Sequence, residues 1–234
     1  MNISLEQFII NQIILRSSML KNISLYYGKM GIILFLVHYF KHTGQKIFSD
    51  IADELMGELT EEFFREKLPI GFGFGLSGIG WGIEYLIQNG FTNDDSLEIC
   101  EGIDKKILEF DPRRITDYSL DTGLEGVLHY ILAHIKGVMF QHAGIPFDET
   151  YLYDIYQVIL SIPKEKELSE NLKLLSTEYV TFYENRKKKL DYKLHISFVV
   201  EDVDLNIDFL NDNPIGLKNG MAGYLIKNLI EKTL

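Results

Sequence analysis

A Gly-x-x-Gly segment followed by apolar residues occurs four times in this chain, and its regular spacing constrains the fold more than any other feature. The four segments begin at Gly28, Gly75, Gly123 and Gly220. Their first glycines lie 47, 48 and 97 residues apart (75−28, 123−75 and 220−123), so the last interval is about twice the others. A fixed period in this range is typical of repeat proteins, whose units bury apolar surface against their neighbours. The spacing predicts repeat units starting near residues 28, 75, 123 and 216, with a degenerate unit over residues 164–213.

Each regular unit is predicted to be a helical hairpin. Helices that are apolar on nearly every side follow the first three glycine segments, over residues 29–42, 75–88 and 123–140. Helices with one apolar face follow over 47–67 and 96–110, and a third starts at Asp148 or Glu149. Ser96 is the expected N-cap of the second of these. Neither kind of helix can bury its apolar surface alone, so we expect a single all-α domain over residues 1–234, formed by stacked hairpins.

Residues 164–213 depart from this pattern. A helix is predicted around residues 168–182. Apolar residues then alternate with other residues over 194–200 and again over 203–209, which is the period of a β-strand. Two alternatives follow for this stretch: a β-hairpin near residues 193–210, or a continued helix.

Composition excludes several classes of function. The 234 residues carry a formal net charge of −11, which argues against a nucleic-acid partner because phosphate binding needs clustered Lys and Arg. The longest apolar run near the start of the chain, residues 31–40, is too short to span a membrane, and no signal peptide is recognised, so a cytoplasmic location is expected. The single cysteine, Cys100, allows neither an internal disulfide nor a site with several thiolates.

Three of the glycine segments resemble those of the lanthionine synthetase C-like family. They are Phe74–Trp81, Ser119–Gly126 and Gly216–Gly223. The family fold is an α/α toroid in which inner helices ring a central cavity and outer helices surround them. The family toroid has seven units, whereas this chain has four or five. The resemblance therefore implies an α/α toroid-like array that forms an incomplete or small ring.

The resemblance also implies a zinc chemistry whose ligands this sequence lacks. In the family, two cysteines and one histidine hold zinc, from a Trp-Cys-x-Gly and a Cys-His-Gly segment, and zinc activates a substrate thiol for addition to a dehydrated Ser or Thr. Here Trp81 is followed by Gly82, and Gln141–Gly144 lacks the cysteine. No ligand can be carried over, so we predict neither a metal site nor a cofactor. Cys100 is expected to be a structural thiol in an outer helix.

Two carboxylates are candidates for catalysis. Asp121 and Glu125 are spaced to share one face at the start of the third apolar helix, and paired carboxylates serve as general acid and base in glycosidases. The alternative is that they only complement the helix dipole or cap the helix. His129 and His134 do not share a helix face well and are expected to be packed or surface residues.

The loops before the apolar helices are expected to form a binding rim for an extended peptide. The rim candidates are Tyr27, Phe74, Trp81, Tyr118, Lys218 and Asn219. The alternative is that these residues pack the interfaces between units. We interpret the chain as a zinc-free, non-cyclising family member that binds peptides or assists modified-peptide maturation. The other hypotheses are an enzyme that uses the carboxylates on a glycan, and a scaffold that forms homo-oligomers through the open end of the array near Leu234.

Overall fold

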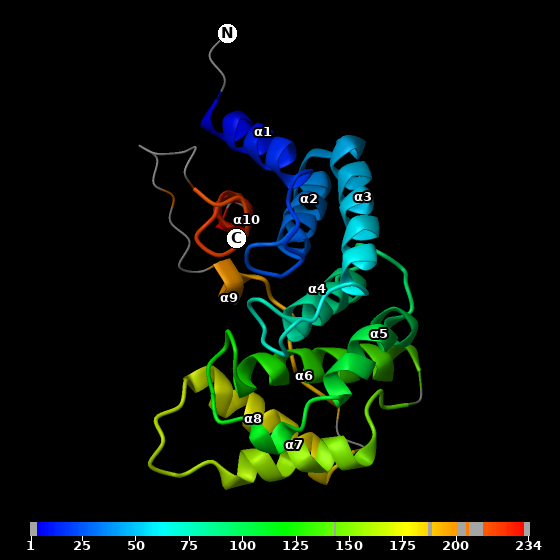
Figure 1. Ribbon diagram of the computed structural model, residues 1–234, viewed down its shortest axis with the longest axis vertical. Coiled ribbons are helices and arrows are strands. Elements are labelled where there is room, and N and C mark those ends of the chain that lie inside the picture. Colours follow the sequence, from blue (N-terminus) through cyan, green and yellow to red (C-terminus); the bar gives the residue numbers. More distant parts are fainter. Residues whose placement is uncertain (1–3, 143, 187–188, 201–204, 206–212, 232–234) are drawn as a thin grey trace. The chain divides into compact units, whose positions relative to one another are not determined.

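The computed structural model describes residues 4–142, 144–186, 189–200, 205 and 213–231, and these residues are helical with connecting loops. No strand occurs among them, which confirms the predicted all-α class (Figure 1). The chain forms two compact units, which we describe separately. Unit 1 comprises residues 1–67 and 195–234, and unit 2 comprises residues 68–194. The expected single domain stays a prediction.

Unit 1 is organised around a buried helix, α2. Its described helices are α1 (Leu5–Ser17), α2 (Lys29–Thr43), α3 (Lys46–Phe63), α9 (Ser197–Val200) and α10 (Met221–Glu231). Every residue of α2 from Lys29 to Leu36 is buried, and α2 packs against α3 and α10. The charge of Lys29 is compensated because its Nζ lies 2.8 Å from Glu58 Oε2 and 3.0 Å from Glu62 Oε1, both on α3. Unit 1 therefore repeats the predicted pairing of a buried helix with an amphipathic one.

Unit 2 is organised around two buried helices that pack on each other. Its helices are α4 (Leu76–Gln88), α5 (Ser96–Leu108), the 3₁₀ turn η1 (Pro112–Arg114), α6 (Leu124–Gln141), α7 (Glu149–Ser161) and α8 (Glu170–Glu184). α4 packs against α6, and α5 packs against both of them. α8 covers another part of α6, and α7 packs on η1 and α8. The interior of unit 2 thus lies around α6.

The four helices that follow glycine segments begin with the same backbone hydrogen bond. The first N–H of α2, α4, α6 and α10 donates to a carbonyl seven residues earlier, at Asn22, Pro69, Asp117 and Pro214, with N···O distances of 2.8, 2.9, 3.0 and 2.8 Å. At Gly75 and Gly123 an added Cβ would collide with the accepting loop carbonyl, although both backbones are extended with φ of −139° and −112°. Close approach of the loop, and not a left-handed backbone, therefore requires glycine there.

The loops before adjacent buried helices are also bonded to each other. In unit 2, Gly73 N donates to Asp121 O at 3.0 Å, which joins the loop before α4 to the loop before α6. In unit 1, Leu217 N donates to Tyr26 O at 2.7 Å, which joins the loop before α10 to the loop before α2. Within each unit, neighbouring buried helices therefore start from connected loops.

The β-hairpin alternative near residues 193–210 is wrong for the residues that the structure describes. Ser197–Val200 forms the helical turn α9, and residues 189–196 pair with no strand in the described part of the chain. Alternate burial does occur just before α9, because Leu190, Tyr192, Leu194 and Ile196 are buried while the residues between them are exposed. It ends at Ile196, since α9 buries the consecutive residues Val199 and Val200. Successive side chains of an extended segment point in opposite directions, so every second one can be buried without hydrogen bonds to a neighbouring strand. Residues 201–204 and 206–210 lie outside the described residues.

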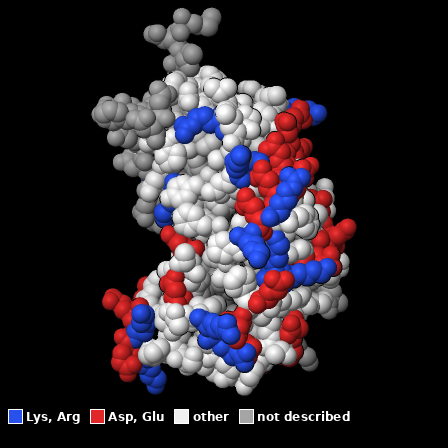
Figure 2. All heavy atoms as spheres, in the orientation of Figure 1, with Lys and Arg blue, Asp and Glu red and all other residues white. Residues whose placement is uncertain are grey.

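Acidic side chains gather over α3, as Figure 2 shows. Asp50, Asp53, Glu54 and Glu61 are exposed on this helix. Their position opposite the buried face agrees with the amphipathic pattern of α3. Among the described residues, no helix has both the length and the apolar character needed to cross a membrane.

Replacing Gly80 by Ala is expected to destabilise unit 2. Gly80 lies on α4 against the ring edge of Tyr130, and an added Cβ would overlap that ring. Tyr130 is 0 % exposed and its hydroxyl is bonded to Asp104, so the ring has no room to move. We expect a loss of about 1–3 kcal/mol in the free energy of unfolding, the usual effect of overpacking a core. Denaturant unfolding followed by circular dichroism measures it.

The matched control is Gly57→Ala on α3. Apart from the adjoining residues and backbone of α3 itself, no atom lies within 4 Å of the added Cβ there. This variant should gain roughly 0.5–1 kcal/mol, the difference in helix propensity between Ala and Gly. Equal behaviour of the two variants would contradict the packing described for Gly80.

Candidate functional site

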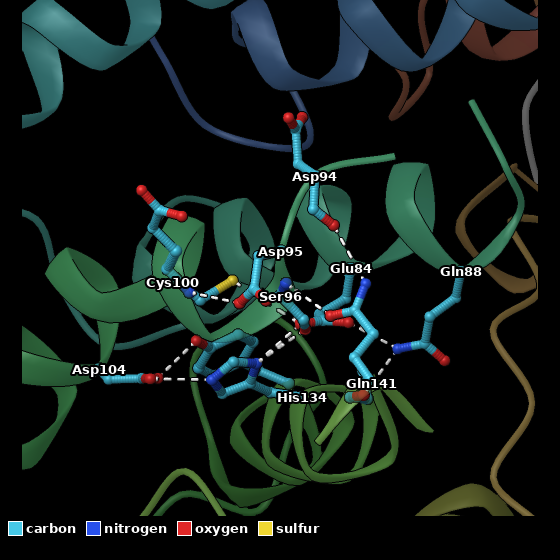
Figure 3. A network of polar contacts seen from close by, with 12 residues as sticks. Glu84, Gln88, Asp94, Asp95, Ser96, Cys100, Asp104, His134 and Gln141 are labelled. Carbon is cyan, nitrogen blue, oxygen red and sulfur yellow. Dashed lines mark hydrogen bonds and ion pairs between the residues drawn. The ribbon is translucent and has the colours of Figure 1, made fainter. Parts of the chain in front are cut away.

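Six polar side chains of unit 2 meet in the interior between three helices, and Figure 3 shows most of them. We call them the α4–α5–α6 cluster: Glu84 from α4, Ser96, Cys100 and Asp104 from α5, and Tyr130 and His134 from α6. Five of the six are 0 % exposed and Asp104 is 6 % exposed. Burial of polar groups is costly unless each one has a hydrogen-bond partner, so the contacts within the cluster decide its character.

His134 is the centre of the α4–α5–α6 cluster. Its Nδ1 lies 2.7 Å from Glu84 Oε1 and its Nε2 lies 2.8 Å from Asp104 Oδ2. Burial lowers the pKa of His134, but hydrogen bonds to Asp104, Cys100 and Glu84 outweigh it and raise that pKa to about 12. His134 is therefore an imidazolium that donates to one carboxylate at each nitrogen.

The Glu84 carboxylate is held by groups from all three helices. Gln88 Nε2 donates to Glu84 Oε2 at 2.6 Å and to Ala133 O at 2.8 Å. The Ser96 hydroxyl donates to Glu84 Oε1. The predicted N-cap role of Ser96 is wrong, because Asp95 Oδ1 caps α5 by accepting from Glu98 N at 3.0 Å. Ser96 becomes the first residue of α5, so its hydroxyl points to Glu84 instead of capping the helix.

Cys100 and Tyr130 complete the cluster. Cys100 Sγ lies 3.8 Å from Glu84 Oε1, and burial raises the pKa of the thiol to about 11 although its interaction with His134 opposes this. Cys100 is therefore protonated at neutral pH and is a poor nucleophile in this state. The Tyr130 hydroxyl donates to Asp104 Oδ1 at 2.6 Å, and its ring stacks on His134 with centroids 5.4 Å apart. Every charge in the cluster is thus bonded inside unit 2.

A second buried chain of polar groups lies beside α4 and α6. The Tyr192 hydroxyl accepts from Trp81 Nε1 at 2.9 Å and donates to His129 Nδ1 at 2.8 Å. Burial lowers the pKa of His129 to about 3, so its imidazole is neutral and Nδ1 accepts the tyrosine proton. This chain anchors the extended segment around Tyr192 to the two buried helices of unit 2.

A model of the family described as lanthionine synthetase C-like protein matches residues 20–184, which extend from the loop before α2 to the end of α8. The chain belongs to the lanthionine synthetase C-like family. Neither the search of curated proteins nor the search of solved structures found a match. The matched residues include the whole α4–α5–α6 cluster.

The residues present do not fit the zinc site that membership of the lanthionine synthetase C-like family implies. That site needs two cysteines and a histidine, and these 234 residues contain one cysteine, which lies on α5. Gly82 follows Trp81 and has no donor side chain. His142, in the Gln141–Gly144 segment, directs its Nε2 to Asp95 Oδ2 at 2.6 Å. No step of thioether formation can therefore be derived for this chain through that group.

The structure places the two candidate carboxylates at the start of α6. Glu125 is 5 % exposed and its Oε2 accepts from the Ser169 hydroxyl at 2.5 Å. Ser169 is also the N-cap of α8, so Glu125 connects the starts of two helices. Asp121 is half-buried, and its backbone carbonyl takes part in the bond to Gly73. Gly123, and not Asp121, is the N-cap of α6. A catalytic role for the pair stays a prediction.

The six candidate rim residues are divided between the two units. Tyr27, Lys218 and Asn219 belong to unit 1, and Phe74, Trp81 and Tyr118 belong to unit 2. Phe74 is 44 % exposed and Tyr118 is half-buried, whereas Trp81 is 0 % exposed. Trp81 packs inside unit 2 and offers no ring to a ligand in this structure. Lys218 Nζ lies 5.3 Å from the centre of the Tyr26 ring, so it also takes part in packing.

Sequence reasoning missed Glu84, Asp104 and His134 as members of one site. Glu84 and His134 are ionisable residues within largely apolar, buried helices, and this mismatch is a signal that could have drawn attention to them. The three residues lie up to 50 positions apart in the chain. Only the packing of α4, α5 and α6 brings them together.

The burial of neutral His129 predicts that stability decreases in acid. Its pKa is about 3 in the folded protein, against about 6.5 in an unfolded chain. The unfolded state therefore binds more protons between these values, and the free energy of unfolding falls as pH decreases from about 6.5 towards 3. One proton corresponds to about 1.4 kcal/mol per pH unit. We expect His129→Gln to reduce the slope between pH 6 and pH 4 by about this amount, as measured by urea unfolding at each pH.

His195→Gln is the control for this measurement, because His195 is exposed. Its slope should match that of the unmodified protein. An unchanged slope in His129→Gln would show that His129 is not buried in its neutral form.

Proposed function

We propose that this lanthionine synthetase C-like protein binds a peptide without cyclising it and acts as an accessory protein in modified-peptide maturation. Two observations support the proposal. The donor set for the family's zinc is incomplete in these residues, and the one thiol is enclosed in unit 2 with a raised pKa. A surface hollow beside the start of α6, described next, provides a place for a peptide side chain.

The observation that carries the proposal is this hollow, which we call the α6–α8 hollow. Residues 116–120, Glu125 and residues 166–169 line it, and its volume is about 380 Å³. This size is within the range of small-ligand sites, about 300–1,000 Å³. Its walls include Tyr118, a predicted rim residue, and Glu125, a predicted carboxylate. An aromatic ring and a carboxylate on one concave surface suit a basic or aromatic side chain of a peptide.

The charge of the α6–α8 hollow favours a cationic guest. Asp117, Glu125 and Glu167 line it against a single Lys166. The pKa of Asp117 is lowered by hydrogen bonds from the Thr122 hydroxyl and from Ser119, so its carboxylate is ionised at neutral pH. Lys166 Nζ lies 5.7 Å from the centre of the Tyr118 ring, which shows that this ring accommodates an ammonium group. We infer that a Lys or Arg of the bound peptide displaces Lys166 and takes its place over this ring.

Two variants in the α6–α8 hollow should weaken the binding of basic peptides. Glu125→Gln removes a charge and Tyr118→Ala removes the ring. We expect each to raise the dissociation constant about tenfold, or ~1.4 kcal/mol, the usual size of one charge-assisted or cation–π contact. Fluorescence anisotropy with short peptides that carry Lys or Arg measures this, with Glu-substituted peptides as comparison.

The controls remove the same groups elsewhere in unit 2. Glu101→Gln removes an exposed carboxylate of α5, and Tyr153→Ala removes a 48 % exposed ring of α7. Neither should change binding. If Glu101→Gln weakened binding as much as Glu125→Gln, net charge and not the hollow would explain the affinity, and the proposed site would be wrong.

The absence of cyclisation is tested with a peptide that contains a dehydroalanine and a cysteine. Thioether formation conserves mass but consumes the thiol, so the number of alkylatable thiols is counted by mass spectrometry. We expect this number to be unchanged after incubation with the protein. Loss of the thiol at a rate above the buffer control would refute the non-cyclising function.

A further inference from the structure

The α4–α5–α6 cluster contains three metal-binding donor types at one point. Glu84, Cys100 and His134 each offer one ligand atom, and these atoms all lie within 4.8 Å of one another. The three residues come from three different helices and each is 0 % exposed. Figure 3 shows the carboxylate, sulfur and imidazole directed toward the same region. A hydrogen-bond network alone does not require a thiol at this point.

The groups around these donors are arranged as in an outer coordination shell. Histidines that bind metals through one nitrogen usually donate the other N–H to a carboxylate. Asp104 Oδ2 accepts from His134 Nε2 at 2.8 Å, which leaves Nδ1 directed to Glu84 and toward Cys100. Gln88 holds the other oxygen of Glu84 at 2.6 Å. Ser96 Oγ is a fourth potential donor and lies 3.5 Å from His134 Nδ1.

We propose that Glu84, Cys100 and His134 bind one divalent transition-metal ion of the zinc type. Nitrogen, sulfur and carboxylate oxygen are the donors that zinc prefers, and Mg²⁺ or Ca²⁺ would require oxygen donors alone. The site is closed by α4, α5 and α6 and ties these helices together, as structural zinc sites do. Its donors differ from the two cysteines and one histidine of the family, and the inference is independent of the proposed peptide binding.

Metal binding exchanges protons for the cation, because a thiol and an imidazole bind metals in their deprotonated forms. A proton lost from each of Cys100 and His134 balances the two charges of the cation, so the net charge of the cluster does not change. The Glu84–His134 contact of 2.7 Å must widen to about 3.3 Å, the ligand separation in a tetrahedron with bonds of about 2.0–2.1 Å.

Cobalt(II) added to the chelator-treated full chain tests the proposal. Cobalt adopts the same tetrahedral sites, and a thiolate ligand produces a charge-transfer band in the near ultraviolet. Because the chain has a single cysteine, this band identifies Cys100 as a ligand without any variant. We expect the band to saturate at one cobalt per chain, to be reversed by zinc, and to be accompanied by the release of two protons. A protein that binds no cobalt, or binds it without the band, would overturn the proposal.

Two variants distinguish a metal ligand from a residue that only positions a ligand. Cys100→Ser retains the shape of the side chain and should abolish the band and weaken metal binding at least tenfold. Asp104→Asn, which alters the partner of His134 Nε2, should weaken cobalt binding by about 10–100-fold while the band remains at saturation. If Cys100→Ser bound cobalt as tightly as the unmodified protein, the site would lie elsewhere.

Two control variants should leave cobalt binding unchanged. Ile107→Val removes one methyl group from the same buried side of α5 without touching a donor. His142→Gln removes the contact of His142 with Asp95, a partly exposed imidazole–carboxylate pair at which a metal ion could bind adventitiously. Loss of binding in His142→Gln would contradict the buried site. Circular dichroism of each variant confirms that it is folded before the titration.

Discussion

The structure depends on how the first N–H groups of its buried helices are hydrogen-bonded. A helix begins with N–H groups that have no partner within the helix, and inside a protein these groups cannot turn to water. In α2, α4, α6 and α10 the first of them is bonded to the loop carbonyl seven residues earlier. This bond brings the loop so close that a side chain at Gly75 or Gly123 would collide with it. The regular spacing of the glycines therefore reflects a backbone hydrogen bond that recurs at the start of each of these helices.

A charged side chain on a buried helix must also have a partner that compensates its charge. In unit 2 the side chains of Glu84 and His134 are hydrogen-bonded to each other. Asp104 of α5 accepts from both His134 and Tyr130 and completes the network. In unit 1 the same demand is met differently, because Lys29 of α2 is paired with two glutamates of the amphipathic α3. Such pairs contribute little net stability when compared with apolar side chains, but removing one partner is costly. We infer that they favour the observed rotation of the helices against one another, in which both partners meet.

The helical fold was predictable because its signals are local. The glycines mark the helix starts, and the four-residue steps of α3 or the N-cap at Asp148 can be read within a few turns of chain. The prediction of a β-hairpin was misled in part by Leu194 and Ile196, because alternate burial in an extended segment produces the same period as a paired strand. The α4–α5–α6 cluster was not predictable, since Cys100 appears structural in its own helix and His134 appears packed in another. Their meeting depends on helix rotation, which has no signature in a short window of sequence.

The order of the two units along the chain has a consequence for how the protein is made. Unit 2 is continuous over residues 68–194, whereas unit 1 joins residues from both sides of it. The hydrogen bond from Leu217 N to Tyr26 O joins two parts of unit 1 that are separated in the sequence by the whole of unit 2. During synthesis, α1, α2 and α3 leave the ribosome before unit 2, yet α2 lacks its neighbour α10 until translation has passed residue 231. The apolar face of α2 that contacts α10 is therefore without this partner while unit 2 is synthesised. Apolar surface exposed in this way makes a nascent chain prone to aggregation.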